Sequence, residues 1–327
     1  MIGDRHGALT LGAAAVAGVS GIRTHQDPLL GERALARNSE RLGLQDRYAS
    51  HALDEDLLRG AKVVLLQLPR GLDALDEIAA AIARWADPSV TVFAGGRVKH
   101  MTLAMNEVLA RSFTEVSAGL GWRKARVLTA AGPRAVGPSS YPRWGEDPDL
   151  SFSLAAHGAT FGGPTLDHGS RLLLAGLGDA MMGAERIVDL GCGNGVLAVA
   201  AALASPRAQV IATDQSAAAV AATLATAEAA GVTGRVAVHR ADGAEAILDG
   251  WADLILLNPP FHSGSTVHTG VAHRLIRSCS RALAPGGELR LVLNSHLGYR
   301  PLVERVIGPV QQVARDRTFT VLSAIRR

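Results

Sequence analysis

Four consecutive residues in the last third of the chain, Asn258-Pro259-Pro260-Phe261, combine a side-chain amide, two prolines and an aromatic ring. The amide of Asn258 and the carbonyl of Pro259 can accept both hydrogens of an NH2 group, and Phe261 offers a face on which a flat base can stack. The two prolines stiffen the loop, so little entropy is lost when a substrate binds. The pattern predicts a clamp that presents an amine nitrogen for reaction, with catalytic residues Asn258, Pro259, Pro260 and Phe261.

A glycine-rich turn, Asp189-Leu-Gly-Cys-Gly-Asn-Gly195, lies upstream of the clamp. The apolar run before it predicts a strand, and the alanine- and leucine-rich run after it predicts a helix. The three glycines permit positive φ and leave no Cβ between the backbone and a ligand, so a flat molecule can lie close to the turn. The dinucleotide fingerprint fails here, because Val196 stands where its third glycine is required.

Acidic residues follow the next two predicted strands. Asp214 comes after the apolar run 208–213, and Asp242 comes after the run 235–239. An acid at the tip of the second strand can accept both hydroxyls of a ribose, and Asp242 is placed to meet an adenine amino group. Asp214 could instead simply favour the start of the following helix. Strands and helices alternate here, which predicts a mainly parallel sheet with its ligands at the carboxyl ends of the strands.

These motifs resemble those of the class I S-adenosylmethionine-dependent methyltransferases. Residues 189–195 match the cofactor motif, and residues 258–261 match the N-P-P-[FYW] motif of members that methylate exocyclic or amide nitrogen. The resemblance implies S-adenosyl-L-methionine as the cofactor, and a stretch similar to residues 161–170 packs over its methionine end in the wider family. Asp167 in that stretch could also simply cap the following helix. The expected cofactor contacts are Phe161, Asp167, Gly169, Asp189, Gly191, Cys192, Gly193, Asn194, Gly195, Asp214, Asp242 and Asn258.

The N-terminal half repeats the C-terminal half at a shift of about 190 residues. Residues 63–70, for example, correspond to residues 254–261. In the first copy Arg5 replaces the middle glycine of the turn, Gln67 replaces the amide of the clamp, and Arg70 replaces its aromatic ring. Bulky and charged groups therefore stand where a cofactor and a base would lie. We expect the first copy to bind no S-adenosylmethionine.

The predicted fold class is α/β, with two tandem Rossmann-like domains that arose by internal duplication. The C-terminal domain is expected to hold a mainly parallel seven-stranded sheet. A run rich in glycine, proline and serine, residues 131–142, marks the seam between the two domains. The predicted parts are a degenerate, non-catalytic domain for RNA binding or structural support over 1–135, a linker over 136–150, and a catalytic cofactor-binding domain over 151–327.

A duplicated layout whose second copy carries the clamp followed by His262 resembles the ribosomal RNA guanine-N2 methyltransferases of the RsmC/RlmG type. The resemblance covers nearly the whole chain. It implies that the acceptor is the 2-amino group of one guanine, flipped out of ribosomal RNA or of a ribosomal subunit particle. Gly193-Asn194 and the run 122–126 favour the large-subunit branch. By the same alignment the chain begins at the residue equivalent to Asp189, and we expect the first strand of the N-terminal domain to be missing or cut short.

The net charge of +3 permits RNA binding without requiring it. Arginine grips phosphate with two hydrogen bonds and stacks on bases, which favours a nucleic-acid partner, although a basic cluster could equally be a solvated surface. Two basic clusters in the N-terminal half are formed by Arg97, Lys99 and His100, and by Arg123, Lys124 and Arg126.

The two cysteines, Cys192 and Cys279, lie too far apart in sequence to suggest a disulfide scaffold or a zinc site. We therefore expect a cytoplasmic protein in a reducing compartment, monomeric and without a metal. The alanine-rich run 8–19 is too short to cross a bilayer and is expected to form a helix, so no membrane partner is predicted.

Three other functions fit parts of the pattern. An adenine N6 or a protein glutamine amide suits an Asn-Pro-Pro clamp, although glutamine methylators favour tyrosine at 261 and a helical lead domain. An RNA-binding assembly factor that retains cofactor without turnover is disfavoured by the intact clamp. A nicotinamide oxidoreductase is disfavoured because Val196 breaks its fingerprint.

Overall fold

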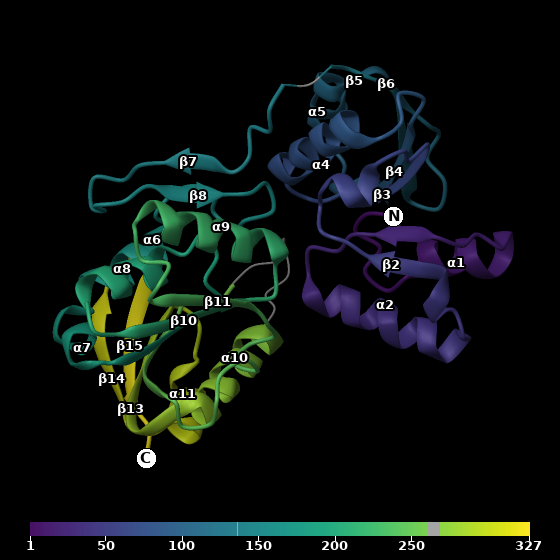
Figure 1. Cartoon of the computed structure of the whole chain (residues 1–327). Coiled ribbons are helices and arrows are strands. Elements are labelled where there is room, and N and C mark those ends of the chain that lie inside the picture. Colours follow the sequence, from purple (N-terminus) through teal and green to yellow (C-terminus); the bar gives the residue numbers. More distant parts are fainter. Residues whose placement is uncertain (136, 261–268) are drawn as a thin grey trace. The chain divides into compact units, whose positions relative to one another are not determined.

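The structure, a computed structural model, describes residues 1–135, 137–260 and 269–327. The contacts within the chain divide it into two compact units (Figure 1). The first unit comprises Met1–Pro142 with His157–Ala159, and the second comprises Arg143–Ala156 with Thr160–Arg327. Each unit has its own sheet and its own apolar core.

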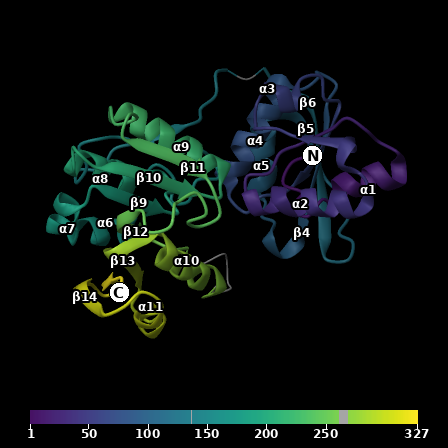
Figure 2. The same cartoon turned by 60° about the horizontal axis from the view of Figure 1, so that its bottom comes forward.

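In its described residues, the second unit is built on a seven-stranded sheet in the order β11-β10-β9-β12-β13-β15-β14. Strands β9 to β13 pair in parallel, and β15 lies antiparallel to both of its neighbours. Figure 2 shows β11, β10, β9, β12 and β13 following one another across the sheet. The mainly parallel seven-stranded sheet predicted for this half of the chain is confirmed. The strands are β9 (Arg186–Leu190), β10 (Gln209–Asp214), β11 (Val236–Arg240), β12 (Ala252–Leu257), β13 (Leu283–Asn294), β14 (Val310–Arg315) and β15 (Phe319–Ile325).

Helices cover both faces of this sheet. Successive residues of β12 point to opposite faces: Leu254 and Leu256 join the core formed with α6, α8 and α9, whereas Ile255 and Leu257 join the core formed with α10 and α11. Because both faces are buried, the strand is a continuous apolar run in the sequence. The helices are α6 (His168–Ala175), α7 (Gly178–Gly183), α8 (Val196–Ala204), α9 (Ala217–Ala229), α10 (Thr269–Ala282) and α11 (Arg300–Val306).

A short antiparallel hairpin, β7 (Arg143–Gly145) with β8 (Leu154–Ala156), opens the second unit. The N–H of Ala155 donates to Thr226 Oγ1 of α9 at 3.0 Å. The hairpin is therefore fastened to the helix layer of its own unit.

The first unit contains two sheets. Strands β1 (Ile22–Thr24) and β2 (Tyr48–Ser50) pair in parallel. A four-stranded sheet has the order β3-β4-β6-β5, with β3 (Val63–Gln67), β4 (Thr91–Arg97), β5 (Phe113–Ala118) and β6 (Ala125–Pro133). Ile2 forms bridges with His25, next to β1, and with Leu66 of β3, so it lies between the two sheets. The helices are α1 (Ala8–Ala17), α2 (Leu29–Leu42), α3 (Glu55–Leu58), α4 (Leu72–Trp85) and α5 (Ala104–Ser112), with 3-10 turns at Gln45–Arg47 and Val98–His100.

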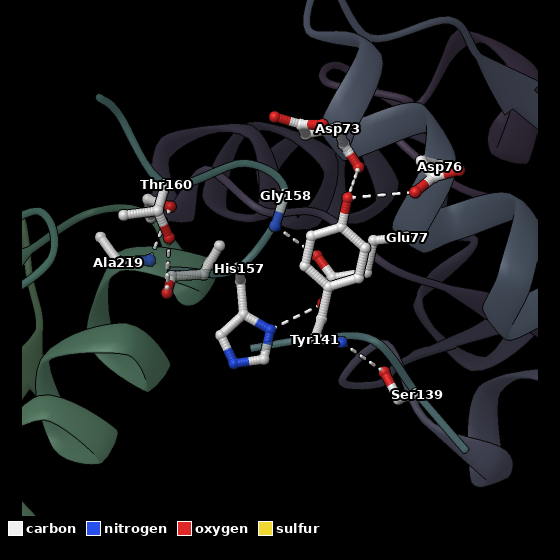
Figure 3. A network of polar contacts seen from close by, with 11 residues as sticks. Asp73, Asp76, Glu77, Ser139, Tyr141, His157, Gly158, Thr160 and Ala219 are labelled. Carbon is white, nitrogen blue, oxygen red and sulfur yellow. Dashed lines mark hydrogen bonds and ion pairs between the residues drawn. The ribbon is translucent and has the colours of Figure 1, made fainter. Parts of the chain in front are cut away.

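The segment His157–Ala159 belongs to the first unit because it docks on α4 (Figure 3). Nδ1 of His157 lies 2.6 Å from Glu77 Oε1, and the N–H of Gly158 donates to Glu77 Oε2 at 2.7 Å. Tyr141 donates from its hydroxyl to the carbonyl of Asp73 at 3.0 Å. A Cβ at Gly158 would lie 2.3 Å from the same carbonyl oxygen, so only glycine fits there. Helix α4 therefore holds both ends of the chain segment that leaves this unit and returns to it, through the carbonyl of Asp73 and the side chain of Glu77.

Residues 1–135, 137–260 and 269–327 contain neither a membrane-spanning helix nor a metal-binding cluster. No helix in these ranges is long and apolar enough to cross a membrane. No group of three or more His, Cys, Asp or Glu side chains in the same ranges is placed to hold a metal ion. Cys192 and Cys279 are both buried and unpaired.

Candidate active site

The residues singled out in the second unit gather at the carboxyl edge of its sheet. Leu190 at the end of β9 pairs with Leu257 of β12 on one side and with Thr213 of β10 on the other. The glycine turn follows Leu190, Asn258 follows Leu257, and Asp214 follows Thr213. The predicted cradle and the predicted clamp therefore begin at the same edge of neighbouring strands.

The described residues leave part of the main chain of the glycine turn uncovered. Gly191, Gly193 and Gly195 have φ values of 85°, 57° and 82°, which favour glycine. A Cβ built on Gly191 or Gly193 would meet no atom of the described residues within 4 Å. A Cβ on Gly195 would lie 2.9 Å from Thr223 Cγ2 of α9, so this glycine is required for helix packing. The first two glycines therefore leave room for a flat ligand, and the third holds the turn in place.

Asp214 ties the turn to the next loop. Its carboxylate accepts hydrogen bonds from the N–H of Gly193 at 3.2 Å and from the N–H of Ser216 at 2.9 Å. Ser216, and not Asp214, is the N-cap of α9, because its hydroxyl accepts from the N–H of Ala219 at 3.2 Å. Asp214 thus places a carboxylate directly beside the uncovered part of the turn.

Asp242 follows β11 and contacts α10. Its carboxylate lies 3.1 Å from Nη2 of Arg274, and its N–H donates to Glu245 Oε1 at 2.9 Å. Arg274 therefore offsets the negative charge of Asp242 within this unit.

Asp189 supports the turn from inside the core. Its side chain is buried, and Oδ2 accepts from the N–H of Ala198 in α8 at 2.9 Å. Its other oxygen, Oδ1, has no hydrogen-bond partner among the described residues. Burial raises the pKa of Asp189 to about 7, against the opposing effect of the Ala198 hydrogen bond, and the charge of Asp214 adds to the rise. The hydrogen bond between Asp189 and Ala198 joins strand β9 to helix α8.

The side chains of Cys192 and Asn194 are engaged by the protein itself. Cys192 is buried, and its Sγ accepts from Thr223 Oγ1 at 3.2 Å. Nδ2 of Asn194 donates to the carbonyls of Gly163 at 3.0 Å and Thr165 at 2.9 Å. Asn194 thereby fastens the loop before α6 to the glycine turn. The main chain is engaged here as well, because the N–H of Cys192 donates to the carbonyl of Thr213 at 3.0 Å and the carbonyl of Asn194 accepts from Thr226 Oγ1 at 2.9 Å.

Phe161 opens that loop and is 75% exposed. At the other end of the loop, Asp167 is the N-cap of α6, as one reading of the sequence suggested. Its Oδ1 accepts from the N–H of Gly169 at 3.0 Å and of Ser170 at 3.1 Å. The loop from Phe161 to α6 is therefore held at Asn194 and at the helix start, while the Phe161 ring faces solvent.

Asn258, the amide of the predicted clamp, contacts the start of α6. Its Nδ2 donates to Asp167 Oδ1 at 3.1 Å and to Ser170 Oγ at 3.0 Å. A Cβ on Gly169 would lie 3.3 Å from both Nδ2 and Oδ1 of Asn258, so the absence of a side chain there allows the close approach. Asp167, Gly169 and Asn258, which lie far apart in the sequence, are thus brought together.

The rest of the clamp is described in part. Pro259 is buried and Pro260 is exposed. Phe261 and His262 lie outside the described residues. The stacking role predicted for Phe261 therefore stays a prediction.

Two residues that the structure places at the site, Ser170 and Thr223, carry no role that the sequence motifs indicate. Ser170 accepts one hydrogen of the Asn258 amide, and Thr223 contacts the glycine turn. A serine three residues after a helix cap and a threonine inside an alanine-rich helix are common, so neither carries a local signal. Both contacts are visible only once the helices are placed against the strand ends.

Strand order and loop chemistry together define the class of this protein. The order of the seven strands, with a glycine turn that a cofactor can approach after β9 and Asn-Pro-Pro after β12, is that of the class I S-adenosylmethionine-dependent methyltransferases. The uncovered main chain of Gly191 and Gly193 and the carboxylate of Asp214 fit that cofactor.

The chain belongs to the methyltransferase small domain family, whose model matches residues 151–323. A second model, the RLMG N-terminal domain, matches residues 1–134. The membership in the RsmC/RlmG type that the motifs indicated is confirmed.

Several relatives that match over nearly the whole chain carry the name ribosomal RNA large subunit methyltransferase G. The protein of that name from Pseudomonas aeruginosa is 36% identical over 331 residues, which cover 99% of this chain and 86% of the relative. The one from Streptomyces coelicolor is 33% identical over 339 residues, which cover 100% of this chain and 87% of the relative.

A solved structure that matches nearly the whole chain shows the same fold. It is the 16S rRNA N2 methyltransferase RsmC of T. thermophilus, in complex with AdoMet and guanosine. The TM-score is 0.76 at 24% identity, and the match covers 93% of this chain and 82% of that chain. This likeness shows that the two proteins share a fold.

Proposed function

We propose that this chain transfers the methyl group of S-adenosylmethionine to the exocyclic N2 of a guanine in large-subunit ribosomal RNA. The observation that carries the proposal is the amide of Asn258, held by α6 at the strand edge beside the uncovered glycine turn. Its Oδ1, which has no partner among the described residues, can accept a hydrogen of an NH2 group. The nucleic acid is inferred from the relatives, which are named for large-subunit ribosomal RNA, and the base from the guanosine in the T. thermophilus complex.

The cofactor would be held by the main chain of the glycine turn and by acidic residues at the strand ends. We infer that Asp214 accepts the ribose hydroxyls and that Asp242 meets the adenine. Phe161, Asp167 and Gly169 would border the methionine end. When bound, S-adenosylmethionine supplies a methyl group attached to a sulfonium sulfur, which becomes a neutral thioether when the amine nitrogen takes the methyl group.

The acceptor is held by the clamp. Asn258 Oδ1 and the carbonyl of Pro259 would each accept one hydrogen of the guanine 2-amino group, which aims the nitrogen lone pair. Phe261 would stack on the flipped base. Because the leaving group is already activated, holding the nitrogen in line provides most of the rate, and the released proton can pass to water.

We infer that the first unit is a degenerate copy of the second. Taken with the bridges of Ile2, its strands follow the order β2-β1-Ile2-β3-β4-β6-β5, which parallels the order β11-β10-β9-β12-β13-β15-β14. Gly7 has a φ of 82° before α1, and Gly195 has the same φ before α8. A Cβ on Gly3 would lie 3.3 Å from the carbonyl oxygen of Gln67, whereas a Cβ on Gly191 would meet no described atom within 4 Å. We propose a non-catalytic domain over 1–135, a linker over 136–150 and a catalytic domain over 151–327; the two family models, which match residues 1–134 and 151–323, support these bounds.

The first unit supplies a surface that suits RNA phosphates. Pairing of β4 with β6 sets Arg97 opposite Ala125, and the N–H of Val98 donates to the carbonyl of Lys124 at 3.0 Å. The six exposed side chains of the two sequence clusters thereby form one basic surface, which we define as Arg97, Lys99, His100, Arg123, Lys124 and Arg126.

Two further observations describe this basic surface. Desolvation lowers the pKa of His100, and the neighbouring charges of Arg70, Lys99 and Arg97 lower it further. These four basic groups therefore lie close together. Trp122, 71% exposed, lies under the guanidinium of Arg123 at 4.5 Å. We infer that the basic surface binds the ribosomal RNA backbone, with Trp122 available for stacking.

The test is a methylation assay on ribosomal RNA from cells that lack this gene. Purified protein is incubated with large-subunit ribosomal RNA or subunit particles and with isotopically labelled S-adenosylmethionine, and the product nucleosides are identified by mass spectrometry. We expect label in N2-methylguanosine with the wild-type chain and a loss of label with Asn258→Ala. Label in N6-methyladenosine or in protein glutamine would overturn the acceptor, and cofactor binding without any transfer would support an assembly factor instead.

A further inference from the structure

Asn258 is held by two acceptors on one helix. Its Nδ2 lies 3.1 Å from Asp167 Oδ1 and 3.0 Å from Ser170 Oγ, so both hydrogens of the NH2 group are engaged. A carboxylate only accepts hydrogen bonds, so the nitrogen of the amide, and not its oxygen, must face Asp167. The orientation of the Asn258 amide is therefore determined by the protein before any substrate arrives.

We propose that Asp167 and Ser170 are positioning residues that fix the hydrogen-bonding polarity of Asn258. With the NH2 group engaged, the clamp offers its acceptor oxygen alone to the substrate, so it selects a hydrogen-bond donor, such as an exocyclic amine, at the reacting position. This inference rests on the proposed function and specifies how the clamp recognises its acceptor group.

The parts that hold Asn258 are themselves rigid. Asp167 Oδ1 also accepts from the N–H groups of Gly169 and Ser170 at 3.0 and 3.1 Å, so it is anchored as the N-cap of α6. Ser170 is 3% exposed, and Leu173 in the next turn is fully buried. Gly169 leaves no atom that could push the amide aside, since a Cβ there would lie 3.1 Å from Asp167 Oδ1 and 3.3 Å from both amide atoms of Asn258.

The orientation matters because an amide rotated by half a turn would present its NH2 group to the NH2 group of the substrate. Two donors facing each other form no hydrogen bond and leave both groups desolvated without a partner. An amide held in the productive orientation needs no rearrangement when the base enters, which is how a preorganised site lowers a barrier. Asp167 and Ser170 therefore act on the reaction through Asn258.

The experiment compares the binding of guanosine with that of inosine, which lacks the 2-amino group and cannot engage Asn258. Affinities are measured by calorimetry or NMR on the full chain saturated with S-adenosylhomocysteine. Ser170→Ala removes one acceptor and keeps the backbone N–H that bonds Asp167. Asp167→Ser keeps a good N-cap residue but is too short to reach Asn258. The matched control is Asp54→Ser, because Asp54 also caps a helix, α3, by accepting from Leu57 at 3.2 Å.

We expect Ser170→Ala and Asp167→Ser to lower the preference for guanosine over inosine by about threefold to tenfold, as for the loss of one hydrogen bond. The control should leave this preference unchanged, and the affinity for S-adenosylhomocysteine should stay within about twofold in Ser170→Ala and in the control. Because Asp167 borders the proposed cofactor site, Asp167→Ser is compared only at saturating S-adenosylhomocysteine. In an Asn258→Ala background neither substitution should lower the preference further, because the group through which they act is gone.

An equal loss of affinity for guanosine and inosine would show that the two residues only support the fold, and would overturn the proposal. An unchanged preference in Ser170→Ala and Asp167→Ser would overturn it as well. Failure of the proposed function is a separate result: a wild-type chain that forms no N2-methylguanosine in ribosomal RNA refutes the reaction itself, whatever the nucleoside affinities.

Discussion

Asn258 meets the acceptor of the methyl group, whereas the glycine turn meets the donor. Asn258→Ala removes the amide oxygen but leaves Gly191, Gly193 and Asp214 in place. We therefore expect the cofactor dissociation constant to change by less than about twofold, while kcat falls by about a hundredfold or more. Calorimetry with S-adenosylmethionine and single-turnover kinetics on ribosomal RNA measure the two effects. Equal losses in both would refute this division of labour.

Asp214 is expected to show the opposite bias. Its carboxylate holds the N–H groups of Gly193 and Ser216, and it is proposed to accept the cofactor ribose. Asp214→Ala should raise the dissociation constant of S-adenosylmethionine by about tenfold to a hundredfold, the range for hydrogen bonds to a charged group. Turnover at saturating cofactor should fall much less. A titration with unchanged affinity would rule out the ribose role.

At the scale of elements, Asp189 joins strand β9 to helix α8 and gives this junction a pH dependence. Burial raises its pKa from the ordinary value of 3.8 to about 7, so between these values the folded protein binds one more proton than the unfolded chain. The contribution of Asp189 to the free energy of unfolding is therefore greatest below about pH 4. It declines as the pH rises to about 7, by at most about 1.4 kcal/mol per pH unit.

Asp189→Asn should remove that slope, because an amide binds no proton yet can still accept from the N–H of Ala198. Denaturant unfolding at several pH values between 5 and 7 measures it. Asp253→Asn is the matched control. The pKa of Asp253, which pairs with Arg186, lies below its ordinary value, so Asp253 changes the free energy of unfolding only at pH values below this range. The same slope in wild type and in Asp189→Asn would contradict the raised pKa.

Elements whose signals are local could be predicted from the sequence. The run 8–19 predicted α1, which ends at Ala17 because Gly18 takes a left-handed φ of 65°. The glycine turn and the clamp were also readable, because each is a short contiguous motif.

Contacts between distant segments could not be predicted in this way. Asn258 and Asp167 are separated by 91 residues, and they meet only because β12 lies beside β9 with α6 over the same edge. Asp189 was expected to contact the cofactor, but a residue at a strand end can point to either face, and the structure directs it to Ala198 in the core.

At the scale of the whole molecule, the basic surface of the first unit should govern RNA affinity without affecting cofactor affinity. Replacing Arg97, Lys99 and Arg126 by serine should weaken binding of large-subunit ribosomal RNA. It should also make the negative slope of log affinity against log salt shallower by about 2, because about three phosphate contacts are lost. Filter binding or fluorescence anisotropy over a salt series measures both quantities.

A matched control removes the same charge elsewhere on the first unit. Arg37, Arg41 and Arg47 are exposed on or next to α2, and replacing them by serine should leave the salt slope close to that of the wild type. If both triple variants lose affinity equally, net charge alone attracts the RNA and the basic surface has no special role.

The central claim is that an amide clamp beside an S-adenosylmethionine cradle methylates one guanine of ribosomal RNA. The most direct measurement is a map of N2-methylguanosine in ribosomal RNA from cells with the wild-type gene, without it, and with the gene encoding Asn258→Ala. We predict one N2-methylguanosine of large-subunit ribosomal RNA that is present only with the wild-type gene. Identical maps from all three strains would contradict the claim.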